Sequence, residues 1–248
     1  ASGSIMRDDK PAAVYLKDYK PPAYLINRTE LHFDLREDCA IVDSRLHLLR
    51  DDSIAENASL ELDGQDLELL SVAVDGCELT ATEYLVRADS LLIHTVPAQC
   101  VVACRTRIRP QDNTSLSGLY KSRKLFCTQC EAEGFRKITY YLDRPDVMSV
   151  FTVTLEANHE SYPVLLSNGN LYDERDIANG RHRAVWHDPF PKPAYLFALV
   201  AGDVVELVFH VGGELYVDDV REMLHEQVVG SEPELGGLED PFYFVDVV

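Results

Sequence analysis

The sequence predicts an all-β protein in which antiparallel sheets pack on one another. Short runs of alternating apolar and polar side chains recur along the chain, and this alternation has the period of half-buried strands. Asp, Gly and Asn separate these runs, as expected of turns between short strands. No long amphipathic helix precedes residue 203. With 248 residues and 46% hydrophobic content, the chain can bury the core that such a β-sandwich needs.

The first strand is expected directly after a proline pair. Pro21 and Pro22 fix φ and hold the chain extended. Over 25–36 apolar and polar residues then alternate, with Phe33 and Leu35 on one face. Further strands are expected at 40–49, 58–62, 67–74, 83–86, 90–94 and 101–108.

The second half of the chain repeats this pattern. Asn168-Gly169 and Asn179-Gly180 tolerate positive φ and predict hairpin turns. The segment 188–193 contains three prolines, which cannot donate ladder hydrogen bonds, so we expect an irregular loop there. Strands are expected at 138–142, 150–156, 162–167, 182–186 and 195–201.

The character of the sequence changes after residue 203. Only 218–227 has the composition of a short helix, and the acidic, Gly-rich segment 228–237 resembles a linker. We therefore expect one β domain over 12–203, followed by a short mixed segment over 204–248.

Charge and composition exclude several classes of function. The chain has 42 acidic and 23 basic side chains, a formal net charge of -19, and this charge opposes binding to nucleic acid or anionic lipid. The longest apolar run, 195–201, is too short to span a membrane. Six cysteines are too few for a disulfide scaffold, and the first residues carry no apolar signal core. We expect reduced thiols in the cytoplasm or an organelle interior such as the mitochondrion, not a secreted protein.

One region of the sequence resembles a known family. The strings GLYKS at 118–122, CTQCEAEGFR at 127–136 and ITYYLDRPD at 138–146 resemble the aminopeptidase N family of zinc aminopeptidases, and the likeness extends over 18–203. The resemblance implies a saddle-like amino-terminal β domain that sits over a thermolysin-like zinc domain and closes one end of its active-site cavity. It also implies that 204–248 is a truncated or diverged segment that lacks the zinc domain.

The same resemblance implies two substrate-binding residues. The position of Glu131 anchors the free α-amine of the substrate, and that of Gln129 lines the pocket for its first side chain. A carboxylate suits this role, since it forms a charge-assisted hydrogen bond that a blocked peptide cannot make. The family supplies a second carboxylate from a Gly-Ala-Met-Glu-Asn segment, which this sequence does not contain.

The sequence lacks the His-Glu-x-x-His zinc motif of the family. The His-Glu pair His225-Glu226 is followed by Val229 where the second histidine is needed. We therefore expect no catalytic residue, no metal ligand and no cofactor in this chain, with zinc present only in the full-length family. By this interpretation the chain alone is inactive as a peptidase.

Other metal or catalytic constellations are weaker. Cys127 and Cys130 could join Cys100 and Cys104 in a four-thiolate zinc site, but the resemblance implies that the first pair belongs to a packed pocket wall. His182 and His187 flank Trp186 and are interpreted as structural. The segment 143–146, Asp-Arg-Pro-Asp, predicts a turn held by an ion pair.

Two functions remain open. The first is a substrate-capping domain of a zinc aminopeptidase that removes N-terminal amino acids from peptides, not catalytic by itself. The second is a non-catalytic structural or interaction subunit of a larger assembly. In both cases we expect a protein partner to cover an apolar and acidic concavity around 127–135, whereas a peptide amino terminus binds only if the domain is joined to a catalytic one.

Overall fold

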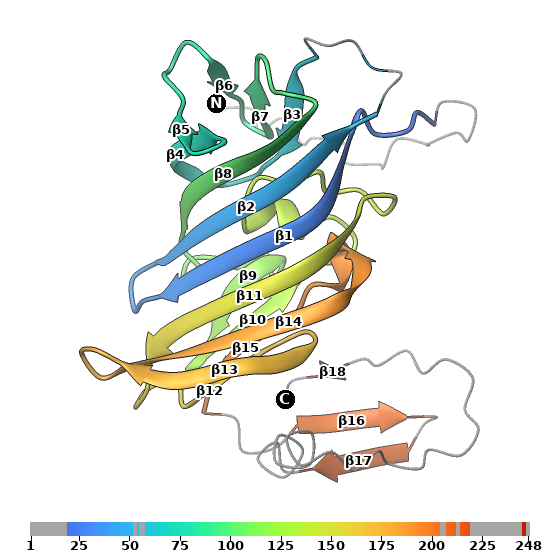
Figure 1. Cartoon of the computed structure of the whole chain (residues 1–248). Coiled ribbons are helices and arrows are strands. Elements are labelled where there is room, and N and C mark those ends of the chain that lie inside the picture. Colours follow the sequence, from blue (N-terminus) through green and yellow to red (C-terminus); the bar gives the residue numbers. More distant parts are fainter. Residues whose placement is uncertain are drawn as a thin grey trace, which may run out of the picture.

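The centre of the molecule is a twisted sheet of eight strands (Figure 1). The computed structural model describes residues 19–51, 54 and 58–203, and the backbone of three strands beyond them. Every neighbouring pair in the central sheet is antiparallel except β1 and β11, which are parallel. In spatial order the strands are β13 (Asn170–Ile177), β14 (Arg181–Pro193), β11 (Met148–Asn158), β1 (Tyr24–Leu35), β2 (Ala40–Arg50), β8 (Gln99–Ile108), β4 (Glu68–Val74) and β5 (Cys77–Glu78).

Three smaller sheets accompany the central one. The first has the order β12 (Val164–Ser167), β15 (Leu199–Gly202), β10 (Leu125–Gln129) and β9 (Gly118–Ser122). The second has the order β3 (Leu60–Asp63), β7 (Ser90–Ile93) and β6 (Tyr84–Val86). The third has the order β17 (Glu214–Asp218), β16 (Leu207–Val211) and β18 (Val245–Asp246).

The four-stranded sheet packs against the part of the central sheet that contains β14 and β1. The indole Nε1 of Trp186 on β14 donates to the carbonyl oxygen of Leu165 on β12, at 3.1 Å. Phe33 of β1 stacks on Phe197, which lies just before β15, with 5.9 Å between ring centroids. These contacts close one continuous core between the two sheets.

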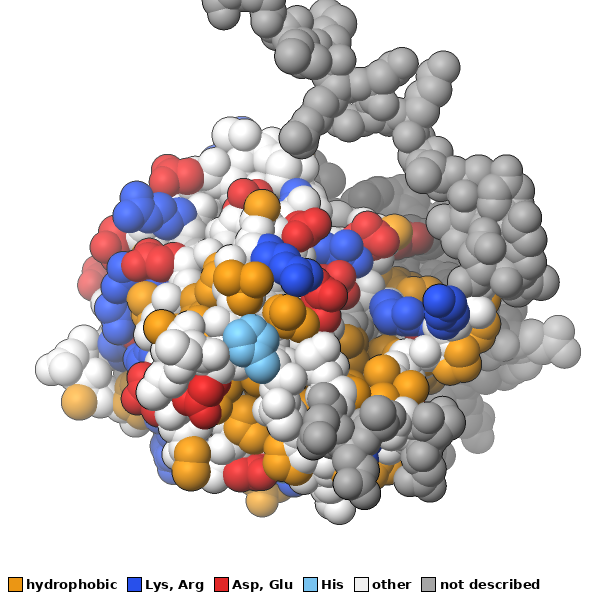
Figure 2. All heavy atoms as spheres, turned by 90° about the horizontal axis from the view of Figure 1, so that it is seen from above, with side chains coloured by type: hydrophobic (Ala, Val, Ile, Leu, Met, Phe, Trp, Pro, Cys, Tyr) orange, Lys and Arg blue, Asp and Glu red, His pale blue; other side chains and the backbone are white. Residues whose placement is uncertain are grey.

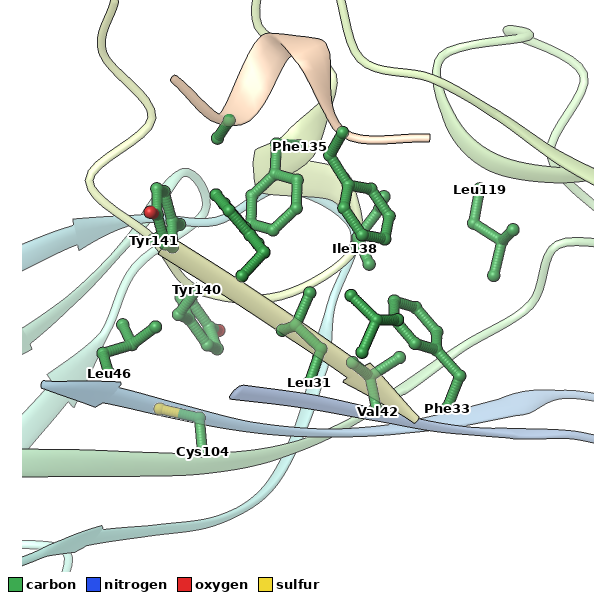
Figure 3. Close-up of a cluster of buried hydrophobic side chains, with 14 of the residues drawn as sticks. Leu31, Phe33, Val42, Leu46, Cys104, Leu119, Phe135, Ile138, Tyr140 and Tyr141 are labelled. Atoms are coloured by element: carbon green, nitrogen blue, oxygen red, sulfur yellow. The ribbon is translucent and has the colours of Figure 1, made fainter. Parts of the chain in front are cut away.

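The core follows from the alternation of the strands. Leu31, Phe33 and Leu35 are buried while the residues between them are partly exposed. Figure 3 shows Leu31, Phe33 and Val42 on the same side of the sheet as Phe135 and Ile138 from the segment that crosses it. Phe135, Tyr141, Phe151 and Phe197 pack at centroid distances between 4.8 and 6.3 Å, in edge-on and tilted geometries that aromatic rings favour.

Polar groups inside this core are hydrogen-bonded. Thr29 Oγ1 lies 3.2 Å from the hydroxyl of Tyr141 and 2.8 Å from Ser149 Oγ. The hydroxyl of Thr139 donates to Ser44 Oγ at 3.0 Å. Because an unpaired buried hydroxyl destabilises a fold, these bonds allow the polar residues to sit among aromatic rings.

The outer face of the central sheet carries ion pairs between neighbouring strands. Arg183 on β14 pairs with Glu156 on β11, and Arg107 on β8 pairs with Glu68 on β4 at 2.9 Å. Basic and acidic side chains also lie next to one another on a different face of the molecule, the one seen from above Figure 1 (Figure 2). The Arg107–Glu68 pair is exposed and therefore contributes little to stability.

The all-β prediction is confirmed. The helical elements of the described residues are two short 3₁₀ helices, η2 (Phe135–Lys137) and η3 (Ala194–Leu196). No helix among the described residues has the length and apolar character needed to cross a membrane. The helix expected at 218–227 lies outside the described residues, apart from Asp218, which ends β17.

Two expected elements are wrong in the region 138–193. The segment 138–142 is not a strand, because its apolar side chains are all buried in the core and only Tyr141 makes a bridge, to Asp63. The proline segment 188–193 is not a loop but the end of β14. β13 begins at Asn170, opposite His187, so one edge of this stretch has no neighbouring strand within the sheet. Prolines at alternate positions can face this open edge, where no ladder hydrogen bond requires their missing N–H donor.

Of the two hairpin turns predicted from Asn-Gly pairs, one is confirmed and the other is wrong. Asn179-Gly180 joins the paired strands β13 and β14, with φ of 64° and 66°, and is the expected hairpin turn. Asn168-Gly169 is not a hairpin turn, because β12 pairs with β15 while β13 pairs with β14. The strand expected over 195–201 begins only at Leu199, after η3.

Further strands were not expected from the sequence. The hairpin of β9 and β10 turns at Arg123, whose φ is 54°, without the Gly or Asn that usually signals such a turn. The edge strand β13 is rich in charge, and the two-residue β5 is too short for a periodic pattern.

Replacing Phe151 by Ala should destabilise the fold strongly. Its ring is 1% exposed and contacts three other aromatic rings, so the change removes buried area and leaves a cavity. We expect a loss of about 3–5 kcal/mol in the free energy of unfolding, measured by urea denaturation. The control is Phe190→Ala, whose ring is 76% exposed, and which should change stability by less than about 0.5 kcal/mol. Equal effects of the two changes would contradict this description of the core.

Candidate functional site

Gln129 and Glu131 lie on one exposed turn. Gln129 is the last residue of β10, and Glu131 follows two residues later. Both residues are exposed, whereas Cys130 between them is buried. The peptide bond from Glu131 to Ala132 is cis, and the amide of Gly134 donates to the carbonyl oxygen of Cys130 at 2.7 Å. The two residues singled out in the sequence therefore reach solvent from the same compact turn.

Glycine is required where this turn packs on β9. A Cβ on Gly134 would lie 2.4 Å from the carbonyl oxygen of Gln129 and 3.0 Å from the amide nitrogen of Gly118, both backbone atoms. Gly118 itself has a φ of +77° and pairs with Gln129 across the β9–β10 ladder. The turn is thereby held directly against the end of the hairpin.

Arg136 anchors the other end of the turn. Its Nε donates to Asp143 Oδ2 at 3.0 Å, its backbone amide donates to the same oxygen at 3.1 Å, and its Nη2 donates to the Asp143 carbonyl oxygen at 3.0 Å. The Asp143 side chain is 2% exposed. Burial raises the pKa of Asp143, although the Arg136 guanidinium acts in the opposite direction. This pair fixes the segment between β10 and η2, which carries Glu131.

The turn expected at 143–146 is confirmed. Arg144 donates from Nε to Asp146 Oδ1 at 2.8 Å and from Nη2 to Asp146 Oδ2 at 2.7 Å. Asp143 does not take part in this pair, because it is bonded to Arg136. Two adjacent Asp–Arg pairs of different burial thus follow one another along the chain.

The segment 127–135 exposes polar groups and buries its apolar ones. Cys127, Cys130 and Phe135 are 5%, 2% and 0% exposed, so the apolar part of the expected concavity faces the core. Glu131 and Glu133 reach solvent and make this surface acidic. A partner that covers this region would therefore meet carboxylates and an amide rather than an apolar patch.

The cysteines do not form a metal site. Among the residues that the structure describes, no group of three or more His, Cys, Asp or Glu side chains is arranged to hold a metal ion. Burial raises the pKa of Cys100 to about 11 and that of Cys104 to about 12, and it also raises the pKa values of Cys127 and Cys130. Without a bound metal, burial therefore favours the protonated form of these thiols near neutral pH.

The histidines examined in the sequence occupy different environments. His182 is buried, and its Nε2 lies 2.7 Å from the carbonyl oxygen of Tyr162, to which it donates. Its ring stacks on His159 with 4.4 Å between centroids. His187 is exposed, with Nδ1 3.1 Å from Thr152 Oγ1. His225 lies outside the described residues.

The sequence did not identify the supports of the turn. Arg136 lies in the short helix η2 and Asp143 seven residues further on, outside any helix or strand, so no periodic pattern predicts their pairing. Gly118 and Gly134 were part of the strings that carry the resemblance, but contact between them depends on the β9–β10 register. The resemblance to the family identified only Gln129 and Glu131, and not the residues that support their turn.

Known proteins similar to this chain are peptidases. The family model described as "Peptidase M1 N-terminal domain" matches residues 49–196. Aminopeptidase N of Caulobacter vibrioides is 49% identical over 199 residues, covering 80% of this chain and 23% of that protein. Aminopeptidase N of Escherichia coli is 45% identical over 217 residues, covering 84% of this chain and 24% of that protein. The chain thus spans about a quarter of the length of these relatives.

Solved structures agree with the fold. The aminopeptidase A of Legionella pneumophila, solved in complex with aspartic acid, superposes with a TM-score of 0.72 at 33% identity, covering 82% of this chain and 24% of that one. An M1 zinc metallopeptidase from Deinococcus radiodurans superposes with a TM-score of 0.64 at 16% identity, covering 79% of this chain and 46% of that one. The second likeness concerns the fold alone.

Replacing Arg136 by Met should destabilise the protein in a pH-dependent way. The change leaves the buried Asp143 carboxylate without its guanidinium partner, at a cost of about 3 kcal/mol near pH 7. The pKa of Asp143 is already raised by burial and would rise further, so the carboxyl can become neutral as the pH falls. The loss should therefore shrink on acidification, as measured by urea denaturation at several pH values.

The matched control for this variant is Arg175→Met. Arg175 is half-exposed and lies 3.6 Å from the carboxylate of Asp173 on the edge strand β13. We expect a change below about 1 kcal/mol at every pH. A loss in Arg136→Met that stayed constant or grew towards low pH would contradict the proposed pairing.

His182 should make stability decrease under mildly acidic conditions. Burial lowers the pKa of His182 in the folded state, and neighbouring His159 acts in the same direction. Below the unfolded pKa of about 6.5 the unfolded chain binds more protons at this residue than the folded one. The stability contributed by neutral His182 is thus present above about pH 6.5 and declines as the pH falls through the window below it.

The variant His182→Gln tests this contribution. It retains a donor for the Tyr162 carbonyl and does not titrate, so it should flatten the pH dependence of stability between about pH 7 and pH 5. His187→Gln, at an exposed position, is the control and should keep the wild-type slope. Identical slopes in all three proteins, measured by thermal unfolding, would contradict the assignment to His182.

Proposed function

Because the chain belongs to the M1 peptidase family and carries its N-terminal domain, we propose that it caps the substrate site of a zinc aminopeptidase. In this proposal it contributes to the removal of N-terminal amino acids from peptides without being catalytic itself. The observation that supports it most is the exposed Glu131 carboxylate on a turn held by Gly134 and by the Arg136–Asp143 pair.

The chemistry of the turn suits recognition of a peptide amino terminus. A free α-ammonium can donate a charge-assisted hydrogen bond to Glu131, and a blocked amino terminus cannot. Gln129 on the same turn offers both a donor and an acceptor beside the first side chain of the peptide. Discrimination then follows from an interaction that only the free amine makes. Because the turn is held at both ends, little ordering is needed when a ligand meets it.

Hydrolysis is proposed to require residues outside this chain. The described residues contain no group that fits a zinc ion, and neither His-Glu pair of the sequence, His159-Glu160 or His225-Glu226, has a second histidine at the required spacing. An exposed carboxylate alone binds an ammonium weakly, because solvent screens the pair. We therefore propose that Glu131 acts only when a second domain closes over it. The buried thiols are consistent with the reducing cytoplasm or an organelle interior, which we include in the proposal.

A chimeric enzyme tests this function. Residues 18–203 would replace the matching region of the Caulobacter aminopeptidase N, which is 49% identical. We expect the chimera to hydrolyse alanine and lysine amides, and Glu131→Gln to raise KM about tenfold, the loss of one charge-assisted hydrogen bond. Glu133→Gln, two residues away and also exposed, is the matched control and should change KM less than about twofold.

The isolated 248-residue chain is the second control. We expect neither amide hydrolysis nor stoichiometric zinc in the purified chain, with or without added zinc. Chelator-sensitive turnover by the isolated chain would overturn the proposal. A folded chimera whose KM does not respond to Glu131→Gln would favour the alternative, a structural or interaction subunit of a larger assembly.

A further inference from the structure

A pocket separate from the Gln129–Glu131 turn lies where β8 ends and β4 begins. Its volume is about 400 Å³, within the range of small-molecule sites. The walls come from the last residues of β8, the residues just before and at the start of β4, the loop that leads to β9, and the end of η2. In Figure 1 β8 and β4 lie next to each other towards the β5 edge of the central sheet.

The charges of the pocket do not all neutralise one another. Arg107 and Glu68 face each other across the β8–β4 ladder and form an ion pair at 2.9 Å. Two cations, Arg109 and Lys137, and two carboxylates, Asp66 and Asp112, also line the pocket. None of these four forms an ion pair with another residue that the structure describes. Lys137 Nζ donates to Ser115 Oγ at 3.4 Å, and Asp66, Arg109 and Asp112 are exposed, so the pocket presents charges of both signs that are not in ion pairs.

The floor of the pocket is apolar and its wall is preformed. Ile108 and Leu119 line it and are 5% and 2% exposed. The Asn113 side chain donates to the carbonyl oxygens of Ser117 and Leu119, each at 2.9 Å, and accepts from the amide of Ser115 at 3.1 Å. These bonds hold the loop in place, so a ligand would not have to order it.

We propose that this pocket binds a free α-amino acid with an aliphatic side chain. Such a ligand carries a carboxylate for Arg109 and Lys137, an ammonium for Asp66 and Asp112, and an apolar group for Ile108 and Leu119. A simple anion would leave both carboxylates unpaired, and a simple cation would leave both basic groups unpaired. The proposal does not depend on the function proposed for Glu131, because the pocket shares no residue with that turn.

Calorimetric titration of the whole chain with L-leucine tests the proposal. We expect saturable binding with a Kd of about 1 mM. N-acetyl-leucine lacks the ammonium and leucinamide lacks the carboxylate, so each should bind at least about tenfold more weakly. Equal binding of either derivative would overturn the proposal, as would the absence of saturable binding of leucine up to about 10 mM.

Variants locate the binding. Arg109→Gln and Asp66→Asn should each weaken L-leucine binding about tenfold. Asn is the appropriate replacement because Asp66 has a φ of 55°, a conformation that Asn tolerates. The control Arg45→Gln changes a well-exposed arginine on the outer face of β2 and should leave the Kd unchanged. Loss of binding in Glu131→Gln but not in Arg109→Gln or Asp66→Asn would assign it to the other site and overturn the proposal.

Discussion

The parallel pairing of β1 with β11 is the constraint on which the rest of the structure depends. It aligns Arg28 with Val150 and Asp34 with Glu156, and so joins the strands of the first half of the chain to those of the second. Two parallel neighbours need a long crossover, and here it contains β2 to β10 and the Glu131 turn. That turn is therefore built on a connection whose two ends are fixed in one sheet.

The crossover returns to the central sheet through buried contacts. Phe135 and Tyr141 pack on Phe151 of β11, and Tyr141 also reaches Thr29 of β1 through its hydroxyl. Arg136 and Asp143 bridge the short segment between these two rings. An exposed, acidic turn is thus supported from below by aromatic packing and by a buried ion pair. The residues that stabilise the fold at this point are thus different from those that reach solvent.

The sequence predicted the inner strands of the central sheet because one face of each is buried. Alternation identified β1, β2, β8 and β11, and Asn179-Gly180 identified a hairpin. The sequence pattern failed at 138–142, where buried tertiary contacts take the place of strand pairing. It also failed at 188–193, where an edge without a neighbouring strand tolerates prolines. The site residues Gln129 and Glu131 came from resemblance to a family. Their supports Arg136 and Asp143 could not be predicted, because their pairing is set by burial rather than by spacing.

The same topology dictates an order of events during protein synthesis. β1, β2, β8 and β4 can pair among themselves once residue 108 has emerged from the ribosome. One edge of β1 then remains open until β11, which ends at Asn158, has also emerged. For the translation of about forty to fifty residues, at about 5–20 residues per second, the unpaired backbone groups of one edge of β1 and the apolar inner face of a half-built sheet are exposed to the cell. The nascent chain is therefore most vulnerable to aggregation and to chaperone binding in this interval, before the second half of its own sheet covers it.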